Sequence, residues 1–211
     1  MKVKKGIFVT FEGCEGVGKT TQVRMLKEYL EQTNQESLFL REPGGTSISE
    51  KIREIILDKN NDKMSNECET FLYCSARSQL VSEVIKPALE EGKLVICDRF
   101  IDSTFAYQGV ARGLGAEYVD TLNKLACNGV MPDLTIFLDL HPTEAFLRKG
   151  GADAEDRLEM AGMAFHEKVY EGYKLAEKMY KDRFVSIDVS GTKQQTQEKI
   201  RNCLKERGII K

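Results

Sequence analysis

The stretch GCEGVGKTT, residues 13–21, strongly limits how this 211-residue chain can fold. Its spacing, G-x-x-x-x-G-K-T, is that of a phosphate-binding loop, which joins a buried strand to the start of a helix. An apolar run, residues 7–11 (IFVTF), precedes the loop, and apolar residues at helical spacing follow it at Val23, Leu26 and Leu30. The sequence therefore predicts the first strand, loop and helix of a nucleotide-binding fold.

The residues of the loop have distinct chemical roles. Gly13, Gly16 and Gly18 allow backbone N–H groups to point inward, and the helix N-terminus adds a positive dipole. Lys19 is expected to reach the phosphates, and the Thr20 hydroxyl to bind Mg²⁺. The predicted ATP-binding residues are Gly13, Cys14, Glu15, Gly16, Val17, Gly18, Lys19, Thr20 and Thr21. One member of this set, the carboxylate of Glu15, is unexpected where phosphates bind.

Apolar runs and helical patterns alternate along the whole chain. Short runs rich in β-branched and aromatic residues predict buried strands at residues 7–11, 37–40, 94–97, 134–140 and 184–189. Helical stripes lie between them, so the fold class expected is α/β, with a five-stranded parallel sheet covered by helices on both faces. The length favours a single domain, residues 1–211. Only RKGGADAEDR, 148–157, fits neither pattern, and we expect it to be a flexible insert between two helices.

Composition excludes several partners and locations. The 31 Lys and Arg residues are balanced by 33 Asp and Glu residues, so no basic field exists for nucleic acid or an anionic membrane. The N-terminal apolar run is too short for a signal peptide or a membrane span, which favours the cytoplasm. The six cysteines are scattered and are expected to be reduced. His141 and His166 lack partners at metal-ligand spacing and are expected at the surface or in helix caps.

Charged residues follow two of the predicted strands. Asp98 and Arg99 follow the third strand, at the sheet edge where ligands bind, and an acid there can hold magnesium or its waters. Arg41 follows the second strand, and Arg77 lies in a predicted helix. Several arginines suit an acceptor that is itself a phosphate, because guanidinium groups bind phosphate oxygens bidentately. Tyr73 shares a helix face with Arg77 and is suited to stacking on a base.

Four stretches together resemble one known family. FEGCEGVGKTT, REPGGT, DRFIDSTFAYQG and PDLTIFLDL, in this order and spacing, resemble the bacterial thymidylate kinases, and the match runs the length of the chain. The resemblance implies a P-loop NTPase fold with a short lid at about 148–157, ATP as co-substrate and Mg²⁺ as cofactor. It implies phosphoryl transfer from ATP to dTMP, giving dTDP and ADP for dTTP synthesis. It also implies a homodimer that packs helices together, here from residues 65–91 or 116–129.

The resemblance further implies roles for single residues. Glu15 would approach the 3'-hydroxyl of the acceptor sugar and the magnesium waters, so that the acid faces the acceptor. Tyr73 would stack on thymine, and Arg77 would bind the base or the phosphate. Arg41 and Arg99 would hold the acceptor phosphate. Arg53 would reach the base edge, and Thr104 and Gln108 would contact the base. The other acceptor-site residues expected are Pro43 and Tyr107.

The predicted lid supplies the remaining cations. The middle of this P-loop, residues 14–17, has no basic residue, and family members of that kind tend to use arginines of the lid instead. The lid offers Arg148, Lys149 and Arg157. Arg148 is the first candidate, and the expected catalytic set is Lys19, Arg99, Arg148 and Glu15.

Other classes of protein fit less well. A regulatory GTPase would need an N-K-x-D motif, and the only candidate, NKLA at 123–126, lacks the Asp. A nucleic-acid-dependent ATPase is disfavoured because the chain has no run of Lys and Arg interleaved with aromatic residues. Within the kinases, a different nucleoside or nucleotide acceptor stays open. Arg41, Arg77 and Arg99 argue against an unphosphorylated nucleoside as the acceptor.

Overall fold

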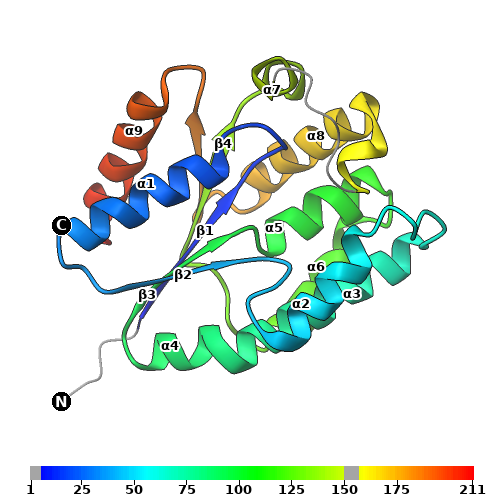
Figure 1. The fold of residues 1–211 in the computed structure, drawn as a ribbon, viewed down its shortest axis with the longest axis horizontal. Coiled ribbons are helices and arrows are strands. Elements are labelled where there is room, and N and C mark those ends of the chain that lie inside the picture. The colour runs from blue at the N-terminus through cyan, green and yellow to red at the C-terminus, as the bar shows by residue number, and fades with distance from the viewer. Residues whose placement is uncertain (1–5, 150–156) are drawn as a thin grey trace.

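The computed structural model describes residues 6–149 and 157–211. Figure 1 shows a central sheet with helices on both sides. The strands are β1 (Ile7–Glu12), β2 (Ser37–Arg41), β3 (Leu94–Asp98), β4 (Leu134–Asp139) and β5 (Phe184–Asp188). They form one parallel sheet in the order β2-β3-β1-β4-β5. The predicted α/β class and the five predicted strands are confirmed.

Helices join the strands, and the first of them contains the predicted stripe of Val23, Leu26 and Leu30. The α-helices are α1 (Lys19–Gln32), α2 (Ser47–Leu57), α3 (Asn66–Leu80), α4 (Lys86–Glu90), α5 (Ile101–Thr104), α6 (Ala116–Cys127), α7 (Pro142–Lys149), α8 (Met163–Met179) and α9 (Lys193–Glu206). Wider π-helical turns form η1 (Val81–Ile85) and η2 (Phe105–Ala111), and η3 (Glu159–Ala161) is a 3₁₀ turn. Residues 66–90 thus form one continuous helical segment across α3, η1 and α4.

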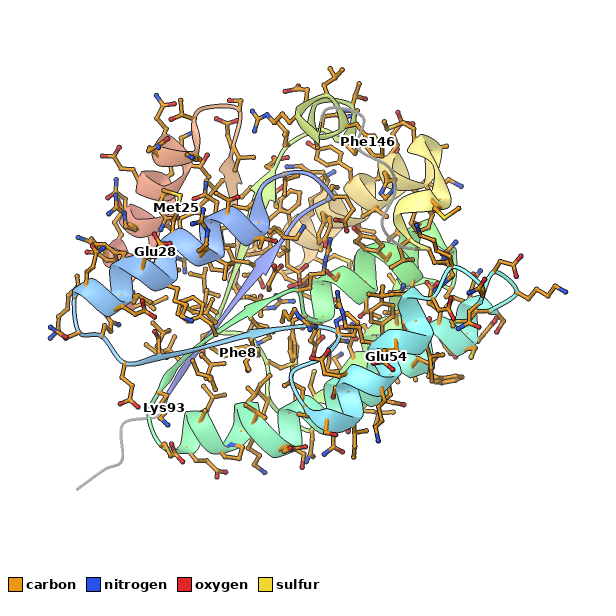
Figure 2. The ribbon with its side chains drawn as sticks, viewed as in Figure 1. Phe8, Met25, Glu28, Glu54, Lys93 and Phe146 are labelled. Carbon is orange, nitrogen blue, oxygen red and sulfur yellow. The ribbon has the colours of Figure 1, made fainter. Side chains whose placement is uncertain are left out.

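The two faces of the sheet bury separate sets of apolar side chains. Successive strand residues point to opposite faces, so Val9 packs with Leu26 of α1, while Phe8 packs with Leu80 at the end of α3. Phe8 is fully buried, whereas Glu28 on the outer side of α1 is exposed (Figure 2). Burial of each such apolar side chain contributes about 1.5–3 kcal/mol.

Parallel pairing brings the functional segments to one edge of the sheet. Phe11 of β1 and Arg41 of β2 both pair with Asp98 of β3. Because parallel strands end at the same edge, the loop after β1, the loop after β2 and the turn after β3 meet there. This edge carries the candidate site.

Two helical segments are absent from the sequence prediction. The segment formed by α5 and η2 carries Thr104, Tyr107 and Gln108, and its π-helical turn changes their spacing around the helix. Helix α9 begins at a capping box in which Thr192 and Gln195 exchange side-chain and backbone hydrogen bonds. The T-x-x-Q pattern of that box is visible in the sequence and could have located this helix.

One histidine lies elsewhere than expected. His166 is buried, with 1% of its surface exposed, between the rings of Phe146 and Phe165. The surface or cap position expected for His166 is wrong because it shares a face of α8 with Val169 and Tyr173, which are also buried. His141 is exposed and accepts from the backbone N–H of Thr143 at 3.4 Å, as a cap residue does.

All six cysteines are free thiols, as the sequence predicts. Cys14, Cys97 and Cys127 are buried, and burial raises the pKa of each of their thiols. Within residues 6–149 and 157–211, no helix has both the length and the apolar surface to cross a membrane.

Candidate functional site

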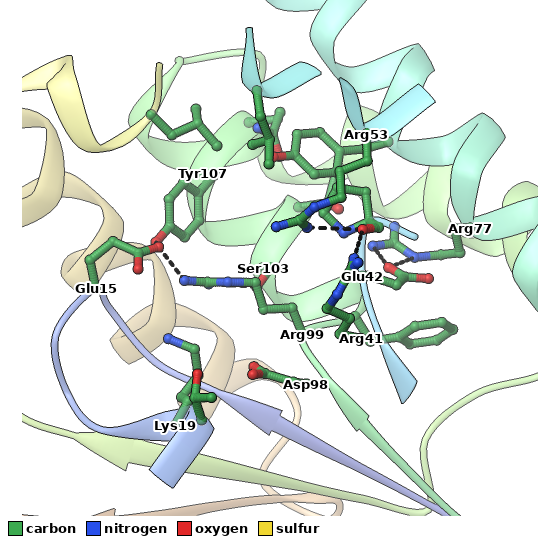
Figure 3. Close-up of a pocket in the computed structure, with 18 of the residues that line it drawn as sticks. Glu15, Lys19, Arg41, Glu42, Arg53, Arg77, Asp98, Arg99, Ser103 and Tyr107 are labelled. Atoms are coloured by element: carbon green, nitrogen blue, oxygen red, sulfur yellow. Dashed lines mark hydrogen bonds and ion pairs between the residues drawn. The ribbon is translucent and has the colours of Figure 1, made fainter. Parts of the chain in front are cut away.

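One cavity of about 450 Å³ opens where the predicted site residues meet (Figure 3). At one end its walls include Glu15, Gly16, Gly18, Lys19, Thr20 and Thr21. Next to them lie the strand-end residues Arg41, Pro43, Asp98 and Arg99. Beyond these are Arg53, Tyr73, Arg77, Thr104, Tyr107 and Gln108. Gly13, Cys14 and Val17 of the predicted set are buried within the P-loop and do not line the cavity.

The P-loop wraps around its own lysine. Lys19 begins α1, and its Nζ donates to the carbonyl oxygens of Gly13 and Cys14, each at 2.9 Å. Burial and the charge of Arg99 lower the pKa of Lys19, which Glu15 partly offsets. Gly16 has φ 77°, and a Cβ there would lie 2.8 Å from the carbonyl oxygen of Ala145, so the loop requires glycine at this position.

The acid of the P-loop turns away from the lysine. The carboxylate of Glu15 forms an ion pair with Arg99 and accepts from the Tyr107 hydroxyl at 3.3 Å (Figure 3). Burial raises the pKa of Glu15, but Arg99 and Lys19 together lower it to about 2. Glu15 is therefore a charged carboxylate at neutral pH, on the side of the loop that faces β3 and η2.

Arg99 occupies a backbone conformation that residues other than glycine seldom adopt. Its φ is 69°, and a left-handed residue of this kind costs about 1–3 kcal/mol. The next residue, Phe100, donates its N–H to Glu12 Oε1 at 2.8 Å, which holds the turn. The Arg99 guanidinium donates to Ser103 Oγ at 3.2 Å and to Gly13 O at 3.3 Å. The turn therefore directs Arg99 across to the P-loop.

Glu12 is a buried carboxylate that sequence reasoning missed. It is the last residue of β1, it has no exposed surface, and its Oε2 accepts from the hydroxyls of Ser103 at 2.6 Å and Tyr173 at 2.9 Å. Burial and the nearby Asp102 raise the pKa of Glu12 to about 7. The position of Glu12, directly between a buried strand and a phosphate-binding loop, is the sequence signal that could have identified it.

Two arginines converge on a carbonyl after β2. Arg41 NH1 and Arg53 NH1 both donate to the carbonyl oxygen of Pro43, at 2.8 and 3.0 Å (Figure 3). Arg41 also pairs with Glu50 at 2.9 Å. The peptide bond between Glu42 and Pro43 is cis.

Arg77 is held by Glu42, a second residue that the sequence did not reveal. Its Nε and NH2 donate to Glu42 Oε2 at 2.9 and 2.6 Å, and its NH1 donates to Asn123 at 2.7 Å. Arg77 is 1% exposed, and its guanidinium lies 4.9 Å from the centre of the Phe100 ring. This arginine is held in place before any ligand arrives.

Three buried polar atoms of cavity-lining residues have no hydrogen-bond partner among the described residues. They are Glu42 Oε1, Asp98 Oδ1 and Thr104 Oγ1. No cluster of three or more His, Cys, Asp or Glu side chains that could hold a metal occurs in residues 6–149 and 157–211. Magnesium commonly binds through one carboxylate, phosphate oxygens and water, so Asp98 and Thr20, which line the same cavity, fit that ion.

Two of the predicted lid cations, Arg148 and Arg157, do not line the cavity. Arg148 donates to the carbonyl oxygens of Val189 and Ser190, at 2.7 and 2.8 Å. Arg157 donates to Glu69 at 2.6 Å and to another backbone carbonyl. The side chain of Lys149 and residues 150–156 lie outside the described part. The catalytic role expected of Arg148 stays a prediction. To reach the cavity, Arg148 would have to break its hydrogen bonds to Val189 and Ser190.

The raised pKa of Glu12 predicts a pH dependence of stability. Between about pH 4.5 and about pH 7 the folded chain holds a proton on Glu12 that the unfolded chain releases, so the free energy of unfolding falls as pH rises. In Glu12→Gln this fall should be shallower when urea unfolding is measured across the same range. Glu177→Gln is the control, because the pKa of Glu177 is lowered and its titration lies below this window. An unchanged slope in Glu12→Gln would contradict the assignment.

Comparison with known proteins gives one consistent result. A sequence model of the thymidylate kinase family matches residues 11–200. A thymidylate kinase of Thermoanaerobacter is 53% identical over 184 residues, which cover 87% of this chain and 90% of the relative. That of Lactobacillus acidophilus is 48% identical over 206 residues, 96% and 95% of the two chains. A crystal structure of thymidylate kinase from Ehrlichia chaffeensis superposes with a TM-score of 0.78 at 31% identity, covering 95% of this chain and 99% of that one. The chain belongs to the thymidylate kinase family.

Proposed function

We propose that the protein transfers the γ-phosphoryl group of ATP to the phosphate of dTMP, giving dTDP and ADP. The observation that carries this proposal is a single cavity with a P-loop at one end and Arg41, Arg77 and Arg99 beyond it. A P-loop binds the phosphates of a nucleoside triphosphate. Arginines at the other end favour an acceptor that is already phosphorylated.

The P-loop end would hold ATP. Backbone N–H groups of the loop and the N-terminus of α1 would bind the β- and γ-phosphates. Lys19 would exchange its two loop carbonyls for phosphate oxygens, which keeps its charge close to the transferring group. Thr20 and Asp98 would hold Mg²⁺, which offsets charge on the β- and γ-phosphate oxygens when bound.

The opposite end would hold dTMP. Tyr73 would stack on the thymine ring, and Thr104 and Gln108 would contact its polar edge. Arg41 and Arg99 would bind the acceptor phosphate, and Arg99 would leave its pair with Glu15 as phosphate oxygens replace the carboxylate. Glu15 would then accept a hydrogen bond from the 3'-hydroxyl of the sugar.

The chemical step needs positioning more than proton transfer. An oxygen of the dTMP phosphate attacks the γ-phosphorus in line, and the bond to the β-phosphate oxygen breaks to release ADP. A phosphate monoester carries nearly two negative charges at neutral pH, so no strong general base is required. Lys19 and Arg99 would offset the charge that spreads over the transferring group.

The most direct test of the function is ADP production with a panel of nucleoside monophosphates and with thymidine. We expect dTMP to give the highest kcat/KM and thymidine to give almost no turnover, since it lacks the phosphate that the arginines bind. A higher kcat/KM for another acceptor would contradict the proposal.

A substitution in the P-loop provides the control for this assay. Lys19→Ala should lower kcat by about a hundredfold or more while the protein stays folded, because its charge acts on phosphate. Lys27→Ala, on the exposed side of the same helix, should have near-normal kcat. Near-normal turnover in Lys19→Ala would contradict the role given to the P-loop.

We further infer that the enzyme acts in the cytoplasm on free nucleotides, without nucleic acid, and that it is a homodimer. Helices α3 and α6 contact each other and leave Phe71 and Leu125 at 50% and 72% exposure. Apolar side chains this open on adjacent helices suit an interface with a second copy.

We predict that light scattering will give about twice the monomer mass of 23.9 kDa. Leu125→Glu should lower this mass toward the monomer, because a buried unpaired charge opposes association. Leu147→Glu, an equally exposed position on α7, should leave it unchanged. A monomer at every concentration would overturn the dimer.

A further inference from the structure

Gln108 lies at the acceptor end of the cavity with its amide held by a buried carboxylate. Gln108 Nε2 donates to Glu69 Oε1 at 2.7 Å, and each residue is only 1% exposed. Gln108 lines the cavity, whereas Glu69 of α3 does not and lies behind it. Nε2 and Oε1 occupy opposite corners of the planar amide. Because Nε2 faces Glu69, Oε1 points away from Glu69.

The charge on Glu69 prevents the amide from reversing. A carboxylate only accepts hydrogen bonds, so a reversed Gln108 would place two oxygens against each other. Glu69 also accepts from Arg112 at 3.1 Å and from Arg157 at 2.6 Å. Burial raises the pKa of Glu69, but the hydrogen bond from Gln108 and the charges of Arg112 and Arg157 lower it below its ordinary value. Glu69 is therefore ionised, and the sense of the amide is fixed.

The fixed amide determines what a ligand meets on the wall. None of the described residues donates a hydrogen bond to Gln108 Oε1, which leaves this oxygen as an acceptor for a ligand. Thymine carries a donor at N3–H, whereas the N3 of cytosine is itself an acceptor. Gln108 Oε1 therefore stabilises thymine by accepting from its N3–H. With cytosine, Oε1 and N3 would be two acceptors facing each other without a proton between them.

We propose that Glu69 is a positioning and specificity-determining residue, which fixes the Gln108 amide so that its oxygen selects pyrimidines with a donor at N3. Glu69 touches no substrate itself and acts through Gln108. The inference rests on the proposed function, in which the base of dTMP contacts Gln108.

Replacing Glu69 by glutamine should release this selection. The new amide has a single oxygen, and the two guanidinium groups of Arg112 and Arg157 form the stronger, charge-assisted hydrogen bonds to it. Its NH2 group would then face Gln108, whose amide would reverse and present Nε2 to the cavity. That arrangement suits the N3 acceptor of cytosine.

The experiment measures kcat/KM for dTMP and for dCMP in the parent and in Glu69→Gln. We expect the ratio of dTMP to dCMP to fall about tenfold or more, since one oriented hydrogen-bonding pair supplies discrimination of this size. Loss of stability alone would lower both values together and leave the ratio unchanged. Arg112→Gln is the matched control, because it also removes the ion pair between Arg112 and Glu69 but keeps the Glu69 carboxylate and its hydrogen bond to Gln108. Its ratio should equal that of the parent.

Four outcomes would overturn an assignment. An unchanged ratio in folded Glu69→Gln, or an equal fall in Arg112→Gln, would overturn the role of Glu69. Should Glu69→Gln not fold, Glu69→Asp keeps the charge but withdraws the carboxylate by about 1.5 Å, and an unchanged ratio there would overturn the same role. A parent protein with no preference for dTMP over dCMP would instead overturn the proposed function.

Discussion

The buried carboxylate of Glu12 joins the two chain segments on which the site depends. It ends β1 directly before the P-loop, and it accepts the N–H of Phe100 in the turn after β3. That turn holds Arg99 in a left-handed conformation that costs about 1–3 kcal/mol. On the β1 side, the turn is held by this contact and by the Arg99 backbone N–H, which donates to the carbonyl oxygen of Phe11 at 2.9 Å. The direction of Arg99 toward the P-loop therefore depends on both contacts with β1.

Carboxylates hold the acceptor end of the cavity in a similar way. Glu42 fixes Arg77, and Glu69 fixes Gln108, each through a buried contact that needs no ligand. Such preorganisation lowers the cost of arranging polar groups when substrate binds. Glu15 is different, because its pair with Arg99 is open to the cavity and can be exchanged. An acid in a phosphate-binding loop is tolerable here because it compensates a nearby arginine and faces the acceptor side.

The sequence predicts the sheet and one end of the cavity from local patterns, whereas Pro43, Arg53, Thr104, Tyr107 and Gln108 follow only from the family resemblance. Alternating apolar runs locate the strands, and the P-loop spacing locates Lys19 and Thr20. It does not predict Glu12, Glu42 or Glu69, since each acts through residues between 35 and 161 positions away. The lid cations were placed by resemblance, and the structure gives Arg148 and Arg157 other partners outside the cavity. Such choices among competing hydrogen-bond partners depend on tertiary contacts that no local pattern encodes.

The measurement that tests this account most directly compares dTMP with its 3'-deoxy analogue in the parent and in Glu15→Gln. If Glu15 serves the acceptor, the parent should lose about tenfold in kcat/KM when the 3'-hydroxyl is missing, because a charge-assisted hydrogen bond is lost. The variant should lose proportionally less, and its affinity for ATP should stay close to that of the parent. Equal losses on the analogue in both proteins would show that Glu15 does not contact the 3'-hydroxyl and would contradict the account.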